Sequence, residues 1–138
     1  MATPTPRKPP LPAAQAFVVC RDIYEDVLTR EMLLIAPFSR ITLPFFPAAF
    51  QLSLFAHLSG GHGTYVLGLE LRDDAGSVSW GWQWPEPLHY PDPLEPYRIN
   101  LRHAVMEFAR PGRYDLVLLA NGEDLANHSL QVALQGPV

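Results

Sequence analysis

Residues 65–84, YVLGLELRDDAGSVSWGWQW, decide the fold class of this chain. Apolar side chains take every second position on both sides of a short turn sequence, Asp73-Asp-Ala-Gly76. Because successive side chains of a strand point to opposite faces, this period of two predicts two half-buried strands joined as a hairpin. The polar residues between the apolar ones predict that the other face of each strand meets solvent.

The same alternation recurs along most of the chain, and no long helical pattern is present. Asn121-Gly122 is the strongest hairpin signal, since both central residues of a type I′ turn need positive φ. The apolar pattern of residues 97–108 changes phase near Arg102-His103, which predicts a β-bulge there. Residues 22–31 suit a short helical turn or a loop. About eight strands are predicted, at residues 16–22, 31–36, 38–43, 51–58, 64–72, 77–84, 97–108 and 113–120, with 128–134 as a ninth.

These features predict an all-β fold, an antiparallel β-sandwich of the jelly-roll or Ig-like kind. Residues 1–14 hold five prolines and are expected to form an extended, disordered tail, which leaves residues 15–138 as a single domain. Residues 85–96 also hold five prolines. Proline donates no ladder hydrogen bond, so this segment is expected to be a stiff connection that crosses from one sheet to the other.

Composition narrows the class of protein. Hydrophobic residues make up 48% and charged residues 17% of the 138 positions, which is typical of a globular domain. The formal net charge of −4 argues against a nucleic-acid-binding face. Cys20 is the single cysteine, which excludes an intrachain disulfide and favours a reducing compartment. With neither a signal-peptide pattern nor a membrane-spanning apolar run in the sequence, a cytoplasmic location is expected.

Several short motifs resemble those of a family of uncharacterised bacterial proteins. The motifs are Phe17-Val-Val-Cys-Arg-Asp22, Leu33-Leu-Ile-Ala36, Leu43-Pro-Phe-Phe-Pro47, Gly63-Thr-Tyr65, Asp73-Asp-Ala-Gly76 and Pro111-Gly-Arg-Tyr114. Arg21 departs from the family's pattern, because it stands where the family's first acidic residue is expected. The resemblance covers residues 15–135 and implies a bacterial β-sandwich. It carries no activity to transfer, because its motifs are structural.

A tryptophan stripe gives the main candidate for binding. Trp80, Trp82 and Trp84 share one face of a predicted strand opposite polar residues, which favours packing in the core. Trp84 lies at the strand end beside the proline-rich segment. Together with His89, Tyr90 and Tyr97 it is the candidate lining of a groove at the rim, for a ligand or a partner.

Standard catalytic and metal-binding motifs are absent from the sequence. It has no G-x-S-x-G elbow, no Walker A loop and no histidine pair at metal-ligand spacing, so no catalytic residue, metal or cofactor is predicted. The leading hypothesis is a non-enzymatic module that binds another protein or itself. One alternative is a carbohydrate-binding module that uses Trp84, Tyr90 and Tyr97. A second is a metal-dependent jelly-roll enzyme in which His57 and His103 meet in space.

Overall fold

The computed structural model describes residues 10–136, and this part of the chain consists of strands, turns and loops without a helix. None of it is therefore a helix that could cross a membrane. The eleven strands in the described residues are β1 (Ala13–Glu25), β2 (Met32–Pro37), β3 (Arg40–Leu43), β4 (Ala48–Ser59), β5 (Gly63–Tyr65), β6 (Leu67–Arg72), β7 (Val78–Gln83), β8 (Leu88–Tyr90), β9 (Tyr97–Phe108), β10 (Gly112–Ala120) and β11 (Glu123–Leu134).

The all-β prediction is confirmed, but the predicted number of strands is too low. The predicted strand at residues 64–72 is divided into β5 and β6 around Val66, and β8 lies inside the proline-rich segment. Proline density concealed β8, because only Leu88–Tyr90 separates the prolines there. The segment does cross between sheets as predicted, since it joins β7 of one sheet to β9 of the other.

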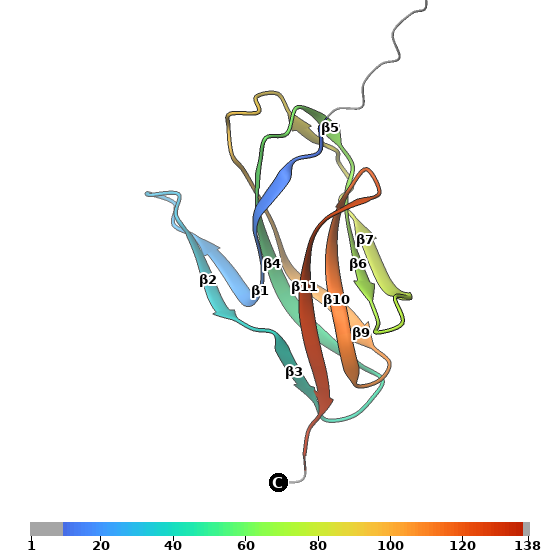
Figure 1. The fold of residues 1–138 in the computed structure, drawn as a ribbon. Coiled ribbons are helices and arrows are strands. Elements are labelled where there is room, and N and C mark those ends of the chain that lie inside the picture. Colours follow the sequence, from blue (N-terminus) through green and yellow to red (C-terminus); the bar gives the residue numbers. More distant parts are fainter. Residues whose placement is uncertain (1–9, 137–138) are drawn as a thin grey trace, which may run out of the picture.

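The strands of residues 10–136 form two large sheets and one small one. The four-stranded sheet has the order β2-β1-β4-β9, the five-stranded sheet β3-β11-β10-β6-β7, and β5 pairs with β8 (Figure 1). Neighbouring strands are antiparallel, as expected, apart from β3 and β11, which are parallel. The antiparallel expectation fails there because the chain crosses from β2 of one sheet straight to the edge of the other.

The two large sheets share one hydrophobic core. Leu52, Leu54 and Leu58 of β4 belong to the same buried cluster as Leu69 of β6 and Leu118 of β10. Alternating positions of β10 were predicted to share one face, and all of them are buried: Tyr114, Leu116, Leu118 and Ala120. The period-two reading of the sequence therefore identifies most of the core.

Register shifts interrupt four strand pairings of the described residues, and two of these β-bulges affect the predicted core faces of β9 and β7. Leu52 pairs with Ala104 and Leu54 with Leu101, so two residues of β9 stand opposite Ser53 alone, as the change of phase predicted. A second bulge was not predicted: Leu71 pairs with Trp80 but Arg72 pairs with Val78. This extra residue turns Val78 to the outer face, where it is 54% exposed, so its expected place on the core face was wrong.

Two buried tyrosines lie at one end of the molecule, where the connections from β4 to β6 and from β7 to β9 meet through the pairing of β5 with β8 (Figure 1). The Tyr65 hydroxyl donates to the carbonyl of Pro10, and the Tyr90 hydroxyl donates to the carbonyl of Glu95 at 2.5 Å. Pro12 is buried and β1 begins at Ala13, so residues 13–14 of the predicted tail are part of a strand. Residues 1–9 of the predicted tail lie outside the described residues.

At the side of the molecule, the β1–β2 hairpin projects beyond the two-sheet body (Figure 1). The strand β1 continues to Glu25, so the loop or helical turn predicted for residues 22–31 is confined to residues 26–31. Asp26 organises this turn: its carboxylate accepts the Leu28 amide at 2.8 Å, and its carbonyl accepts the Arg30 amide at 2.8 Å. Arg30 has φ of 64°, which allows the chain to reverse.

Candidate functional site

The four rim residues predicted from the sequence do not form one exposed surface. Tyr90 is fully buried and contacts Tyr97, with ring centroids 4.6 Å apart. His89, the preceding residue of β8, points to the opposite side and meets the Thr64 hydroxyl at 3.1 Å from Nδ1. Trp84 packs against Trp82 at 4.7 Å between centroids. An aromatic platform made of Trp84, Tyr90 and Tyr97 is therefore not available to a flat sugar ring.

The tryptophan stripe packs against the core, as its favoured interpretation states, yet it is only partly buried. Trp80 and Trp82 lie on β7, the end strand of the five-stranded sheet, and face β9, the end strand of the other sheet. Between them is a cavity of about 320 Å³, which Leu101 and Val105 also line. This groove follows from strand order, which the sequence does not show.

A polar cluster lies where β1 and β9 approach each other across β4. The Asp22 carboxylate accepts hydrogen bonds from Arg102 Nε at 3.0 Å and from the Ile23 amide at 2.8 Å, and His103 Nε2 lies 3.3 Å from it. The Arg102 hydrogen bond, followed by that from the Ile23 amide, holds the pKa of Asp22 well below its usual range. The cluster therefore contains a persistent carboxylate paired with a cation.

The β-bulge fixes His103 in this cluster. His103 has φ of 58°, an uncommon conformation for a residue with a side chain. Its amide donates to Ser53 Oγ at 3.1 Å, and that hydroxyl in turn donates to the Arg21 carbonyl at 3.4 Å. Ser53 and the nearby Cys20 are fully buried, and burial raises the pKa of the Cys20 thiol. The burial and hydrogen bonds of Ser53 and Cys20 favour a structural role for these side chains over nucleophilic attack on a bound substrate.

The predicted approach of His57 to His103 is wrong. His57 pairs with Arg98, whereas His103 stands opposite Ser53, four residues away along β4. At about 3.4 Å per residue, this separates the two histidines by roughly 13 Å along the strand. Among residues 10–136, no group of three or more His, Cys, Asp or Glu side chains is placed to hold a metal ion.

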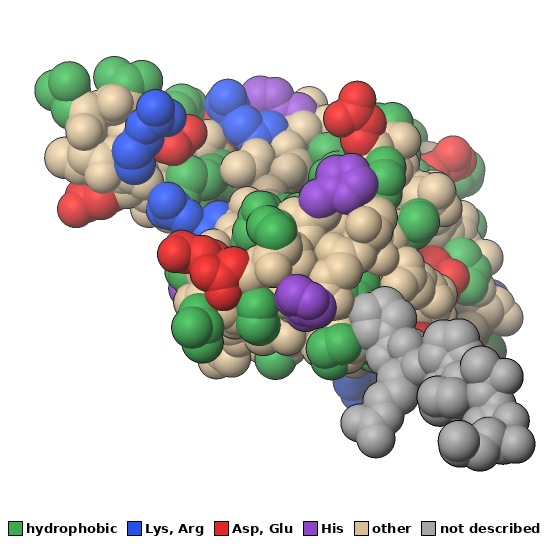
Figure 2. Space-filling model, turned by 90° about the horizontal axis from the view of Figure 1, so that it is seen from above, with side chains coloured by type: hydrophobic (Ala, Val, Ile, Leu, Met, Phe, Trp, Pro, Cys, Tyr) green, Lys and Arg blue, Asp and Glu red, His purple; other side chains and the backbone are tan. Residues whose placement is uncertain are grey.

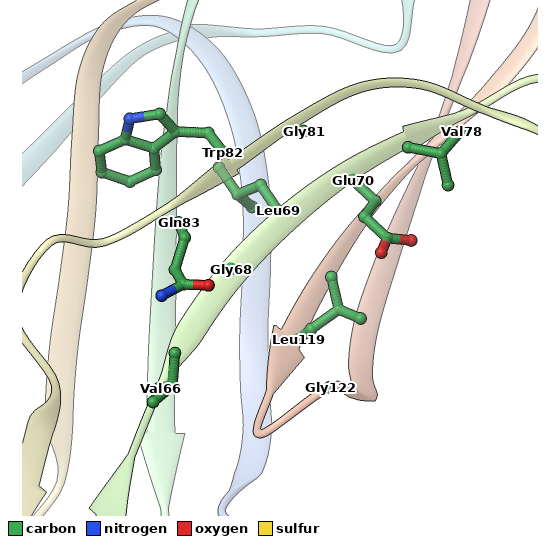
Figure 3. Close-up of a pocket in the computed structure, with 10 residues that line it drawn as sticks. All are labelled: Val66, Gly68, Leu69, Glu70, Val78, Gly81, Trp82, Gln83, Leu119 and Gly122. Carbon is green, nitrogen blue, oxygen red and sulfur yellow. The ribbon is translucent and has the colours of Figure 1, made fainter.

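A further cavity lies on the outer face of the five-stranded sheet (Figure 3). It has a volume of about 410 Å³, and Gly68 and Gly81 leave its floor without side chains. Figure 3 shows Glu70 and Leu119 on one side of the strands and the Trp82 ring on the other. The Glu70 carboxylate already accepts two hydrogen bonds from Arg72, at 2.9 and 3.0 Å. A ligand would therefore find few free polar groups there.

The strongest surface feature is a group of exposed hydrophobic side chains on the β1–β2 hairpin. Its exposed hydrophobic side chains are Tyr24, Val27, Leu28, Leu33 and Ile35. Val27 and Leu28 at the turn are 83% and 91% exposed. Figure 2 shows hydrophobic side chains at the tip of the projecting part, beside a few charged ones. The sequence does contain a signal for this surface. Residues 32–37, MLLIAP, lack the polar alternation of a half-buried strand, and the prediction of a helical turn or loop at residues 22–31 did not use this signal.

Comparison with known proteins identifies the family. The chain belongs to DUF6941, a family of unknown function whose model matches residues 15–133. Among curated proteins no sequence matches this chain. A similar solved structure is the Pseudomonas fluorescens alkylpurine DNA glycosylase AlkC bound to DNA containing an abasic site analog. The match has 16% identity and a TM-score of 0.45, and it covers 69% of this chain but only 28% of that one.

Proposed function

We propose that this domain is a non-enzymatic β-sandwich module for protein binding, and that its partner is a second copy of the same chain. The observation that carries the proposal is the projecting β1–β2 hairpin with its five exposed apolar side chains. Contiguous exposed apolar patches on a small domain mark interaction surfaces. The single cysteine favours a reducing compartment, and we include a cytoplasmic location in the proposal.

The free edge of β2 supports a second copy as the partner. Within the described residues β2 pairs with β1 alone, which leaves its other edge open. Natural edge strands usually carry charges, prolines or bulges that block pairing. In β2 the irregular positions, Ala36 with positive φ and Pro37, lie at its end, and Met32–Ile35 carries no such feature. Two such edges related by a two-fold axis through Leu34 pair antiparallel, with Leu33 of one copy opposite Ile35 of the other.

The charges of the hairpin are compatible with this pairing. Glu25, Asp26, Arg30 and Glu31 all lie at or beside the turn, away from the centre of β2. In an antiparallel pair the two turns point in opposite directions, so the acidic groups of the two copies lie at opposite ends of the joined sheet. Two copies with a net charge of −4 each therefore meet through an uncharged strand.

Sedimentation velocity over a concentration series from about 1 to about 200 μM tests the proposal. The wild type is expected to form a dimer. Leu33→Lys places an unpaired charge in the new interface and is expected to raise the dissociation constant about 100-fold or more. Val105→Lys on β9 is the matched control, because Val105 is 56% and Leu33 is 55% exposed.

Two outcomes would overturn the proposal. A wild type that stays monomeric at the highest concentration would exclude self-association through β2. A dimer that tolerates Leu33→Lys but dissociates with Val105→Lys would move the interface to the opposite edge of the sheet, at β9.

A further inference from the structure

We propose that the cavity between β1 and β3 is a binding site for an oxyanion attached to an aromatic or apolar group. The cavity has a volume of about 280 Å³, and it lies where the chain crosses from β2 to β3. Its lining includes two arginines and two phenylalanines: Arg21, Arg40, Phe38 and Phe50. The cavity adjoins the self-association surface, because Ala36 and Pro37 at the end of β2 also line it, but the inference does not depend on that proposal.

The two arginines supply uncompensated positive charge. Within residues 10–136, neither Arg21 nor Arg40 has a carboxylate within 4.0 Å. Five other arginines of the same part of the chain do form such pairs: Arg30, Arg72, Arg102, Arg110 and Arg113. Guanidinium groups bind carboxylate and phosphate oxygens through paired hydrogen bonds. Two of them lining one cavity of an otherwise acidic protein favour an anionic ligand.

The two phenylalanines supply an apolar wall beside the charges. The Arg21 guanidinium carbon lies 5.6 Å from the centroid of the Phe50 ring, which is within the range of a cation–π contact. The Phe38 ring meets Phe50 edge to face, with centroids 5.7 Å apart and an interplanar angle of 78°. The aromatic contact restricts Arg21, so less side-chain entropy is lost when it binds an anion.

Hydrogen bonds hold the crossing segment that forms one wall of the cavity. The Phe38 amide donates to the Val19 carbonyl at 3.1 Å, and His128 Nε2 lies 2.9 Å from the Phe38 carbonyl. The Gln131 amide donates to the Ser39 carbonyl at 2.8 Å. These bonds connect the segment to strands of both large sheets. The cavity therefore exists before a ligand arrives, as is usual for small-molecule sites.

The combination of these groups defines the ligand class. A bare anion would contact the arginines but leave the phenylalanine wall without a partner, and a neutral apolar molecule would leave the charges unpaired. An aryl or alkyl group that carries a carboxylate or a phosphate satisfies both parts of the site. Both ligand types share an oxyanion, and the titrations below distinguish a carboxylate from a phosphate.

Titrations followed by ¹⁵N–¹H NMR test the site with phenylacetate, phenyl phosphate, inorganic phosphate and benzyl alcohol. We expect saturable shifts of the Phe38, Ser39 and Thr42 amides with at least one aromatic anion, and weaker binding of inorganic phosphate and benzyl alcohol. The tighter of the two aromatic anions identifies the preferred oxyanion. The Leu33→Lys variant is titrated alongside the wild type, so loss of self-association and loss of anion binding are read separately.

Two substitutions decide whether the arginines bind the anion. Arg21→Gln and Arg40→Gln are each expected to raise the dissociation constant about tenfold or more, because a charge-assisted hydrogen bond is lost. Arg98→Gln on β9 is the control and should leave binding unchanged, since Arg98 lies outside this cavity. If Arg21→Gln fails to fold, Arg40→Gln on the exposed face of β3 decides alone. The proposal is overturned if neither aromatic anion gives saturable shifts up to about 10 mM, or if Arg40→Gln binds like Arg98→Gln.

Discussion

The β10–β11 and β1–β2 hairpins have similar local geometry but different surroundings. Both are antiparallel, and both turns contain a residue with positive φ, Asn121 and Arg30. In β10 every residue from Leu116 to Ala120 is buried, whereas β2 has no buried residue. The difference lies in strand order, because β10 has a neighbour on each side and β2 is at the edge of its sheet. An apolar strand is therefore a core element or a contact surface depending on its place in the sheet.

This contrast separates stability from binding in the molecule. Side chains of β10 fill the shared core, so they are expected to determine the free energy of unfolding. The β1–β2 hairpin carries five hydrophobic side chains that are 42% to 91% exposed, and these are expected to affect association much more than folding. Val19, Cys20 and Ile23 of β1 are buried and belong to the part that determines stability. Three measurements test this separation.

The largest effect is expected from a matched pair of leucine truncations. Leu118→Ala in β10 removes a fully buried side chain and should lower the free energy of unfolding by about 2–5 kcal/mol. Leu28→Ala, at a side chain that is 91% exposed, should change it by less than about 0.5 kcal/mol. Urea unfolding followed by tryptophan emission measures both. A cost above about 1 kcal/mol for Leu28→Ala would show that the hairpin tip is packed in solution.

An intermediate effect is expected from the two turns. The side-chain oxygen of Asn121 accepts a hydrogen bond from the Val66 backbone amide at 2.8 Å. The backbone amide of Asn121 donates to the Val66 carbonyl at 2.8 Å. Asn121→Ala should therefore cost about 1–2 kcal/mol, because the Val66 amide loses its partner. Arg30 has a similar backbone conformation, and its carbonyl accepts a hydrogen bond from Arg98 of β9 at 3.1 Å. This bond involves the main chain of Arg30, so Arg30→Ala leaves it in place and should cost less than about 0.5 kcal/mol. Equal costs in thermal unfolding would mean that positive φ alone determines the energy of both turns.

The smallest effect is expected from pH, which acts on the ion pair between Asp22 of β1 and Arg102 of β9. The pKa of Asp22 is lowered in the folded state, mainly by the hydrogen bond from Arg102. A lowered pKa means that the carboxylate stabilises the fold above its unfolded-state pKa of about 4, and that this contribution is lost as pH falls below that value. Stability at pH 7 and pH 3 should therefore differ more in the wild type than in Asp22→Asn. An identical pH dependence in the two proteins would show that the ion pair does not stabilise the hairpin.

The period-two pattern predicted the all-β class and most of the core, because a buried face imposes alternation directly on the residues. It also located the bulge at Arg102-His103, where the apolar phase visibly changes. The bulge beside Trp80 was missed because Val78 is apolar, so the apolar alternation of residues 78–84 is unbroken in the sequence. A β-bulge can therefore be predicted from the sequence only where the side chains that change face also change from apolar to polar or the reverse.

The candidate sites were harder to predict, because strand order and long-range pairing create them. The rim prediction treated His89 and Tyr90 as neighbours in one groove, yet β8 is a strand and places them on opposite sides. Arg21 and Arg40 line one cavity because the chain crosses between sheets and β3 joins β11 in parallel. The antiparallel expectation contained no such pairing, so the sequence alone did not bring these two arginines together.

The parallel pairing of β3 with β11 also has a consequence for how the chain folds. Arg40 lies opposite Gln131, so this edge of the sheet closes between segments separated by most of the chain. Such distant pairings slow folding, because a large loop must close before the contacts are gained. On the ribosome, β3 emerges long before β11 and has no partner in its final sheet until β11 has been synthesised. During that interval Ile41 and Leu43 of β3, which are buried in the folded protein, have no core to pack against, and exposed apolar side chains of this kind favour aggregation.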